Sequence, residues 1–395
     1  MYRKIKIFIS LLIEKMVYLL FFPWFYIMKE KRTGQKQQIF LLSRLDLIGD
    51  VLMTTPAIRA IKEKYPDSKI VLLINKSCSD IVMENPFIDA VFYYSWPWPS
   101  RISKNHFSSI DIPGYFRLFK QLKKINADTF IEFRGDIRMI FLFGFLLGIP
   151  RRISSLRTGG RSFLTDCIIY DKNKHELERA LSLLQPLNVL ATKKRSEIFY
   201  LENDMKFADD LIKNELTDIH AQYAIIAPFS GKEVKEWVPK RWAEIADFLF
   251  EKYKLRSFIV GSRNDTEEAA NILQFANHGL INITGHTSLK QLSALISRSK
   301  LVLGVDSGSL HLASCFDIPI IALFGPTHQN EFRPYSPFAK IVDLHICSCN
   351  KDKHDSCLKP KNGCAFCMNE ITCNHLFEVI DDIAKEHHYF ASANV

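Results

Sequence analysis

The sequence predicts an α/β protein made of two doubly wound parallel sheets in tandem, with an apolar helix in front of them. The 395 residues are enough for two domains, and a hydrophobic share of 47% supports a large core. From residue 37 onward, short β-branched runs alternate with helical patterns, which is typical of parallel strands joined by helices. This alternation is interrupted by a charged passage that begins at Lys193 and then resumes.

The elements follow in order along the chain. The first series predicts strands Gln38–Leu42, Lys69–Ile74, Ala90–Tyr94 and Asp128–Phe133, with helices Val51–Tyr65, Pro113–Ile125 and Asp136–Leu147. The second predicts strands Tyr223–Ala227, Ser257–Val260, Leu280–Ile283, Lys300–Val305 and Ile318–Phe324, with helices Pro239–Tyr253, Thr266–Ala276, Ser288–Ser297 and Ser309–Phe316. Segments 95–112 and 151–170 read as long surface loops. Ligands bind at the carboxyl ends of parallel strands, so two such units predict an inter-domain cleft that holds the ligands.

The amino-acid composition indicates the charge of the expected partners. Lys and Arg number 52 against 43 Asp and Glu, and this net charge of +9 favours acidic partners. The basic clusters lack a recognised nucleic-acid module, so no nucleic-acid partner is expected. A charged share of 24% and ordinary Gly and Pro contents exclude disordered and collagen-like chains.

The N-terminal arm, residues 1–34, is apolar and basic at once. Residues 16–28 form an uncharged apolar run, and the arm carries a net charge of +5. The run is shorter than the roughly 20 residues that a spanning helix needs, and no small-residue cleavage site follows it. We expect a helix that lies on or dips into a membrane surface, with Trp24, Tyr18 and Tyr26 at the interface. A helix packed on the protein's own core and a true span remain as alternatives.

The first motif with a candidate role in catalysis is Gly49-Asp50, after the first predicted strand. Gly49 allows a tight turn, and Asp50 stands directly before the helix predicted from Val51. One interpretation is a helix N-cap, because Asp accepts hydrogen bonds from the free amides of a helix start. The other is a general base that faces the cleft. Spacing alone favours the cap, and Asp46 in the same turn competes for either role.

The second motif is a Ser/Gly turn at 306–309, between a predicted strand and a helix that starts near Ser309. The free amides and the positive dipole end of such a helix suit a diphosphate, and Gly308 lets the backbone approach it. His311 lies in the first helical turn. Its position fits either a contact with a phosphate or sugar or a core histidine, and spacing does not separate the two.

The third motif is the polar loop 228–238, which carries Lys232 and Lys235 at the end of another strand. A cation here is suited to stabilise the charge that grows on a departing diphosphate. Lysines on such loops are usually solvated, which is the simpler interpretation. A fourth segment, Phe324-Gly325-Pro326-Thr327, marks one more strand end on the same predicted edge.

In this order and spacing, the segments resemble glycosyltransferase family 9, the bacterial ADP-heptose:lipopolysaccharide heptosyltransferase family, from about residue 38 to 375. The matching residues are Arg44 with Gly49-Asp50-Val51 and Thr54-Thr55-Pro56-Ala57, Lys235 with Trp237 and Pro239, Asp306-Ser307-Gly308 with His311-Leu312-Ala313, and Phe324-Gly325-Pro326-Thr327. The resemblance implies a GT-B fold of two Rossmann-like domains, with the acceptor in the first and the donor in the second. It also implies an inverting transfer that requires no cofactor or metal.

Carried over residue by residue, the resemblance implies that Asp50 is the catalytic base and Lys235 the catalytic phosphate-binding lysine. The donor and diphosphate side would comprise Ser230, Lys232, Asp306, Ser307, Gly308, Ser309, His311 and Thr327. The acceptor side would comprise Arg44, Gly49, Arg134 and Arg138. Because the loop after Pro228 is long and charged, the sequence leaves open whether Lys232 or Lys235 meets the phosphate.

Cysteines concentrate near the end of the chain, with six of nine between 347 and 373. They are Cys347, Cys349, Cys357, Cys364, Cys367 and Cys373. Four thiolates satisfy a tetrahedral structural zinc site, but the spacing matches no standard zinc finger. A structural zinc and reduced thiols are both open interpretations, and a catalytic metal is not expected.

The predicted organisation is a membrane-associating helix (1–34), an acceptor-side domain (35–195), a nucleotide-sugar-binding domain (196–375) with the Cys-rich loop 347–373, and a C-terminal helix and tail (376–395). The predicted function is an inverting glycosyltransferase that moves a sugar, with a heptose from ADP-heptose favoured, to a lipopolysaccharide-core or related glycolipid. It would act in the cytoplasm, peripheral on the inner face of the bacterial inner membrane. The alternatives are a nucleotide-sugar isomerase or hydrolase of the same fold and a non-catalytic membrane-surface binding protein.

Overall fold

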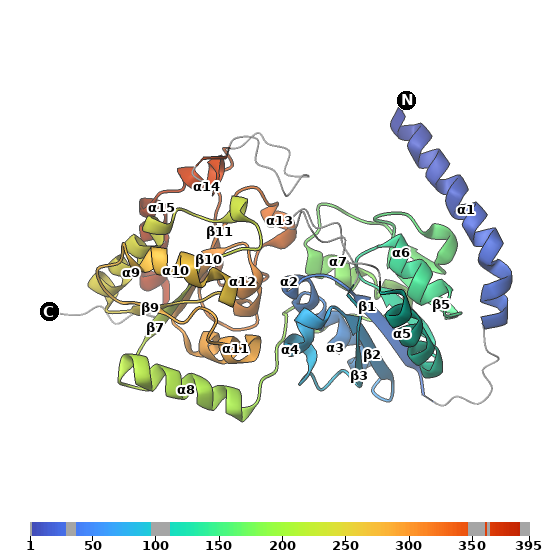
Figure 1. Cartoon of the computed structure of the whole chain (residues 1–395), viewed down its shortest axis with the longest axis horizontal. Coiled ribbons are helices and arrows are strands. Elements are labelled where there is room, and N and C mark those ends of the chain that lie inside the picture. Colours follow the sequence, from blue (N-terminus) through green and yellow to red (C-terminus); the bar gives the residue numbers. More distant parts are fainter. Residues whose placement is uncertain (1, 29–36, 96–110, 347–359, 362–363, 388–395) are drawn as a thin grey trace. The chain divides into compact units, whose positions relative to one another are not determined.

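The computed structural model describes residues 2–28, 37–95, 111–346, 360–361 and 364–387 (Figure 1). The chain divides into two compact units, Met1–Lys194 and Arg195–Val395, which we call the N-terminal and the C-terminal unit. The sequence places this boundary one residue later. Each unit is described by itself.

The N-terminal unit is built around one six-stranded sheet in which all neighbouring strands run parallel, in the order β3-β2-β1-β4-β5-β6. The central strands are buried along nearly their whole length, which explains why they read as continuous apolar runs rather than as alternating ones. The strands are β1 Ile39–Arg44, β2 Lys69–Ile74, β3 Ala90–Tyr93, β4 Thr129–Glu132, β5 Arg151–Ser155 and β6 Asp166–Ile168.

Helices connect these strands. They are α1 Tyr2–Met28, α2 Ile48–Leu52, α3 Thr55–Lys64, α4 Ser79–Val82, α5 Ile112–Ile125, α6 Ile137–Met139 and α7 Glu176–Ser182. Three short 3₁₀ segments, η1 Lys76–Cys78, η3 Arg161–Phe163 and η4 Gln185–Leu187, and the π-helical η2 Ile140–Phe145 complete the unit. Helix α5 follows its sequence pattern closely: the Asp111 side chain accepts a hydrogen bond from Gly114 N (2.8 Å), and Asn126 ends the helix in a left-handed conformation.

Several predictions for this unit are wrong. Segment 151–170 is not a surface loop, because it contains strands β5 and β6. The single helix predicted over 51–65 is two, α2 and α3, which meet where Pro56 enters the first turn of α3. The helix predicted over 136–147 is the short α6 followed by a π-helix. The loop predicted over 95–112 lies mostly outside the described residues.

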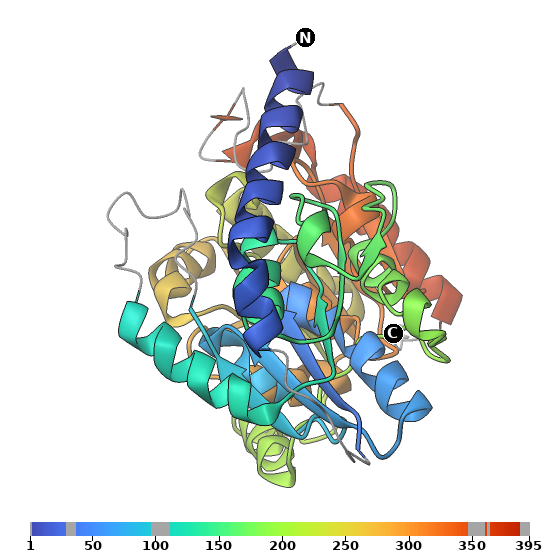
Figure 2. The same cartoon turned by 90° about the vertical axis from the view of Figure 1, so that its right-hand side faces the viewer.

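Helix α1 lies alongside the rest of the N-terminal unit (Figure 2). Val17, Tyr18, Phe21 and Phe25 contact a small aromatic core around Phe145. Other large apolar side chains of the helix are exposed: Leu12, Ile13, Met16, Leu19, Leu20, Phe22, Trp24, Tyr26 and Ile27. Among the described residues, no helix combines the length and the apolar character that a membrane crossing requires.

The C-terminal unit repeats the architecture with a parallel sheet ordered β12-β11-β10-β7-β8-β9. Its strands are β7 Tyr223–Ala227, β8 Arg256–Ile259, β9 Leu280–Asn282, β10 Leu301–Val305, β11 Ile320–Leu323 and β12 Ala339–Val342, with a separate small ribbon of β13 Pro360–Lys361 and β14 Cys364–Ala365. Its helices are α8 Glu202–Leu216, α9 Pro239–Tyr253, α10 Thr266–Leu273, α11 Leu289–Arg298, α12 Gly308–Ala313, α13 Gln329–Phe332, α14 Phe366–Glu370 and α15 Cys373–His387, with 3₁₀ turns η5 Glu233–Lys235 and η6 Arg263–Asp265.

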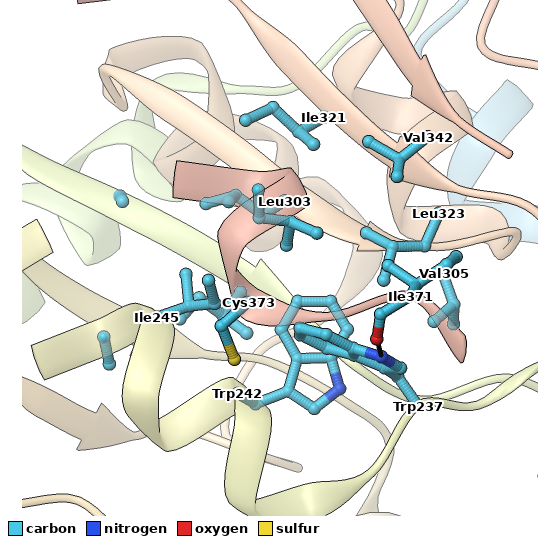
Figure 3. Packing of buried hydrophobic residues seen from close by; sticks show 14 of the residues in the cluster. Trp237, Trp242, Ile245, Leu303, Val305, Ile321, Leu323, Val342, Ile371 and Cys373 are labelled. Carbon is cyan, nitrogen blue, oxygen red and sulfur yellow. Dashed lines mark hydrogen bonds between the residues drawn. The ribbon is translucent and has the colours of Figure 1, made fainter. Parts of the chain in front are cut away.

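The last helices of the chain belong to this core (Figure 3). Trp237 and Trp242 meet edge to face with ring centroids 4.9 Å apart, and the Trp237 indole donates a hydrogen bond to Ile371 O (2.9 Å). Helix α15 packs on α9, with Phe377 stacked on Phe248 at 4.1 Å. The polar loop that ends at Trp237 is therefore fixed at one end by a buried aromatic contact.

Both sheets have the same doubly wound order, so each has one point where the chain direction across the sheet reverses. It lies between β1 and β4 in the N-terminal unit and between β7 and β10 in the C-terminal unit. In open parallel sheets, ligands bind at the carboxyl ends of the strands at this switch point.

Candidate active site

Five charged side chains gather at the switch point of the N-terminal sheet, and we call them the Arg44 cluster: Arg44, Asp46, Asp50, Arg134 and Glu176. Arg44 is the last residue of β1 and is 1% exposed. Its Nη2 lies 2.9 Å from Asp50 Oδ1 and 2.9 Å from Glu176 Oε1, and its Nε lies 2.9 Å from Asp46 Oδ2. A buried guanidinium requires such partners, because an unpaired buried charge is strongly destabilising.

Asp50 is the most accessible carboxylate in contact with Arg44, with a side chain 22% exposed against 2% for Arg44. It is not an N-cap as spacing suggested, because α2 starts at Ile48 and Asp50 is the third residue of the helix. From there Oδ2 accepts a hydrogen bond from Leu47 N (3.3 Å) while Oδ1 faces Arg44. Gly49 lies inside α2, not in a tight turn.

Glu176 is a member that sequence reasoning missed. It sits in the first turn of α7, is 3% exposed, and also pairs with Arg179, whose Nε donates to Oε2 at 2.7 Å. Burial disfavours its charge, but the positive charges of Arg44 and Arg179 prevail and lower the pKa of Glu176 to about 2. Its signal in the sequence is weak, since an acidic residue in a first helical turn is common.

Arg134 joins the cluster through Asp46, with which its guanidinium forms an ion pair. Burial and the neighbouring positive charges of Arg157 and Arg44 lower the pKa of Arg134 to about 10. Arg138, also predicted for this side, instead forms a two-point contact with Asp136 at 2.9 and 2.6 Å.

The segment that carries these arginines is held by Glu132, a second residue that sequence reasoning missed. This buried carboxylate at the end of β4 accepts backbone hydrogen bonds from Arg134, Gly135 and Asp136. An acidic residue directly after an apolar strand is the signal that could have identified it.

The switch point of the C-terminal sheet carries a second set, which we call the Lys235 cluster: Ser230, Lys235, Asp306, Ser307 and Thr327. Lys235 Nζ lies 2.6 Å from Asp306 Oδ2. Burial disfavours the Asp306 charge, but the charge of Lys235 and its hydrogen bond outweigh burial and lower the pKa of Asp306. The structure therefore brings the lysine of the 228–238 loop to the Ser/Gly turn.

Polar groups surround this ion pair. Ser230 Oγ donates to Asp306 O (3.4 Å), and Ser230 N donates to Glu236 Oε1 (2.8 Å). Within the part of the chain that the structure describes, Ser307 Oγ is buried and makes no hydrogen bond. His311 is 6% exposed in α12, close enough that its charge also acts on Asp306.

The remaining predicted donor-side residues flank these groups. Gly308 and Ser309 open α12, one residue before the predicted start, and the buried Thr327 follows β11. Lys232 directly precedes η5, the short turn that ends at Lys235.

The Cys-rich loop falls largely outside the described residues. Within them, Cys367 and Cys373 are buried, and Cys373 Sγ lies 3.0 Å from Glu244 Oε2. No group of three or more His, Cys, Asp or Glu side chains suited to a metal ion occurs among the described residues.

Two doubly wound parallel sheets of the same order are the architecture of the GT-B class of fold. Within that class, the chain belongs to glycosyltransferase family 9: the family model described as glycosyltransferase family 9 (heptosyltransferase) matches residues 115–362, more than half of the chain. The protein is therefore a glycosyltransferase. The matched range includes the Lys235 cluster and Arg134 and begins after Asp50.

Individual relatives agree with this family. Lipopolysaccharide heptosyltransferase 3 of Escherichia coli K12 is 29% identical over 301 residues, which cover 73% of this chain and 83% of the relative. The crystal structure of a family 9 glycosyl transferase from Veillonella parvula superposes with a TM-score of 0.73 at 20% identity, over 88% of this chain and 97% of that one. The E. coli ADP-heptose LPS heptosyltransferase II superposes with a TM-score of 0.69 at 19% identity, over 89% and 99%. At these identities the superpositions show the fold alone.

Proposed function

We propose that the protein is an inverting glycosyltransferase that moves a heptose from ADP-heptose to a hydroxyl of a lipopolysaccharide-core or related glycolipid. The observation that carries the proposal is the partly exposed Asp50 carboxylate held by the buried Arg44 at a sheet switch point. Family membership and a relative named lipopolysaccharide heptosyltransferase 3 support the substrate class.

Asp50 would act as general base. The acceptor oxygen forms a bond to the anomeric carbon from the face opposite the leaving group, the carbon–oxygen bond to the diphosphate breaks, and the hydroxyl proton passes to Asp50. Two fixed hydrogen bonds, from Arg44 and Leu47 N, orient the carboxylate. Once Asp50 is neutral, Arg44 still contacts Asp46 and Glu176, so the proton transfer leaves no unpaired buried cation.

Lys235 would stabilise the charge that develops on the departing ADP, aided by the Ser230 and Ser307 hydroxyls and the amides of the Ser/Gly turn. The Lys235–Asp306 ion pair supports Lys235 over Lys232 as the phosphate contact, because it brings that ammonium group to the turn. A lysine in this position supplies positive charge without a divalent cation. We therefore propose transfer without a required metal or cofactor.

Substitution Asp50→Asn tests the base. We expect kcat to fall by about a hundred- to ten-thousand-fold, with the affinity for ADP within a few-fold of the wild type. The assay follows ADP release and the glycosylated acceptor by mass spectrometry, with Asp67→Asn, a surface change away from the cluster, as the control. Unchanged turnover in Asp50→Asn would exclude the assigned role.

The same assay separates the alternative activities. A hydrolase releases ADP without acceptor, an isomerase converts the sugar nucleotide without releasing ADP, and a binding protein does neither. Stabilisation by a UDP-sugar and not by ADP-heptose would contradict the proposed donor. Loss of activity after treatment with EDTA, restored by a divalent metal, would contradict the metal-free mechanism.

We further propose that α1 places the enzyme on the cytoplasmic face of the inner membrane, where a glycolipid acceptor is found. The exposed apolar face of α1 includes Leu19, Leu20 and Ile27, each at least 69% exposed. The N-terminal arm adds a net charge of +5, which complements anionic headgroups. An apolar face with basic flanks therefore suits a lipid surface.

Flotation with vesicles tests this surface. We expect the full-length protein to float with vesicles that contain anionic phospholipid, and less with pure phosphatidylcholine. The double variant Leu20→Glu/Ile27→Glu should stay in the soluble fraction. Leu190→Glu, at an 88% exposed position in the same unit but off the helix, should float as the wild type does. Equal flotation of both variants would contradict the assignment.

A further inference from the structure

Glu14 is a buried carboxylate on helix α1, next to the exposed Lys15. It is 5% exposed and lies on the inward face of α1. Its Oε2 accepts a hydrogen bond from Gly160 N (3.0 Å), and its Oε1 accepts one from Ser162 N (2.6 Å). Two backbone amides that converge on one carboxylate form a built anion-binding turn, and here the anion is a side chain from another part of the chain.

The backbone of this turn is shaped for that contact. Gly159 and Gly160 both have positive φ, +103° and +95°, which L side chains rarely adopt. A Cβ on Gly159 would lie 3.4 Å from Glu14 Oε2, and a Cβ on Gly160 would lie 3.3 Å from the Ile140 side chain. The turn is therefore enclosed between α1 on one side and the α6–η2 helix on the other.

The same turn is bonded to the segment that carries the acceptor-side arginines. Thr158 N and Oγ1 both donate to Gly135 O (3.1 and 2.9 Å), and Ile137 N donates to Thr158 Oγ1 (2.9 Å). Gly135 and Ile137 stand between Arg134 and Arg138 in the chain. Residues 158–162 are thus hydrogen-bonded to Glu14 at Gly160 and Ser162 and to segment 134–138 at Thr158.

Aromatic contacts hold the rest of the helix against this region. Tyr18 packs on Phe163, at the end of the turn, with ring centroids 6.2 Å apart. Phe25 lies beneath the Arg152 guanidinium at 4.6 Å, and the Trp24 indole donates to Leu146 O (3.0 Å). These contacts hold α1 against the unit, and Glu14 adds hydrogen bonds to the backbone of the turn.

We infer that Glu14 is a positioning residue: by clamping α1 onto residues 159–162 it sets segment 134–138, and so couples the lipid-facing helix to acceptor binding. The inference rests on the proposed function for the assignment of segment 134–138 to the acceptor and of the outer face of α1 to the membrane. Helix α1 then has two faces with two roles, an outer one for the membrane and an inner one that orders the acceptor side.

Hydrogen–deuterium exchange on the full-length protein tests the clamp without reference to activity. In Glu14→Ala, amides in 157–163 and in 134–138 should exchange about tenfold faster or more, because the charged acceptor of two amides is gone. Lys15→Ala, at the neighbouring exposed position, is the matched control and should exchange as the wild type does. If Glu14→Ala does not fold, Glu14→Gln keeps the shape and loses one acceptor, and should show the same pattern more weakly.

Kinetics test the consequence. We expect Glu14→Ala to raise KM for the acceptor about fivefold or more, with KM for the donor within about twofold and kcat little changed. Unchanged exchange in 157–163 overturns the clamp, and faster exchange there with 134–138 unchanged overturns the coupling. A parallel rise of both KM values indicates general destabilisation and overturns positioning. If the wild type transfers no sugar, the proposed function fails while the exchange result still decides the clamp.

Discussion

Arg44 is a cation that the fold keeps buried by surrounding it with carboxylates, and this arrangement gives its partners unequal roles. Glu176 and Asp46 are buried with it, while Asp50 retains a partly exposed side chain. In the proposed mechanism the proton of the acceptor would therefore pass to Asp50, and the two buried carboxylates would keep Arg44 charged and fixed.

Glu176→Gln tests whether the buried carboxylates stabilise the charge of Arg44. The change leaves Arg44 and Arg179 with less compensating charge in a buried place, and we expect the N-terminal unit to lose about 3–5 kcal/mol of stability. Thermal unfolding measures the loss, and Glu178→Gln on the same helix is the control. A melting temperature equal to that of the control would show that the ion pair contributes nothing.

The pH dependence of this stability has a defined sign. The pKa of Glu176 is about 2 in the folded chain, below its ordinary value of 4.5. A carboxyl group with a depressed folded pKa adds stability above its unfolded pKa, and that stability is lost as pH falls through the folded pKa. Urea unfolding between pH 4.5 and about 2 should therefore show a steeper loss for the wild type than for Glu176→Gln. Parallel curves would contradict the assigned pKa.

At the scale of elements, the Lys235 cluster depends on the close approach of β7 and β10. Gly304 in β10 lies opposite Ala227 in β7, and a Cβ on Gly304 would come within 2.5 Å of the Ala227 carbonyl oxygen. Asp306 follows β10 directly, and Ser230 is the third residue after β7. The distance between β7 and β10 therefore determines the distance between Ser230 and Asp306.

Gly304→Ala should force the two strands apart. We expect a loss of about 1–3 kcal/mol of stability, together with weaker binding of ADP by calorimetry, because Ser230 and Asp306 separate. Gly231→Ala is the control for stability, since a Cβ there meets nothing within 4 Å. Unchanged stability and ADP affinity in Gly304→Ala would show that β7 and β10 accommodate the added methyl group without loss of stability or of ADP binding.

For some helices and strands, sequence patterns are sufficient to predict the bounds. Strands β2 and β7 and helix α9 have the predicted bounds, because buried parallel strands and amphipathic helices carry strong local patterns. Strands β5 and β6 were predicted as loop because both are short and take their strand conformation from pairing. Strand β5 is rich in Arg and Ser and pairs with β4, and β6 has three residues and pairs with β5. The π-helix η2 packs its Gly144 against Phe130, a tertiary contact with no local signature.

For the whole molecule, the sequence predicted the two-sheet organisation and the candidate residues that follow strands, since a strand end is recognisable locally. It could not predict Glu176 or Glu14, because both act through partners more than 130 residues away in the chain. Spacing alone also favoured an N-cap at Asp50, which is wrong because the start of a five-residue helix depends on contacts that spacing does not record.

Two compact units, each with its own sheet, should unfold as two transitions in differential scanning calorimetry. Because the Lys235 cluster belongs to the C-terminal unit, ADP at about a hundred times its Kd should stabilise one transition by about 2.7 kcal/mol and leave the other nearly unchanged. Lys235→Ala should abolish the shift and Lys232→Ala should largely keep it, while Glu176→Gln should lower only the transition that ADP does not move. A single transition, or a shift by ADP of the transition that Glu176→Gln lowers, would contradict the assignment of the donor to the C-terminal unit.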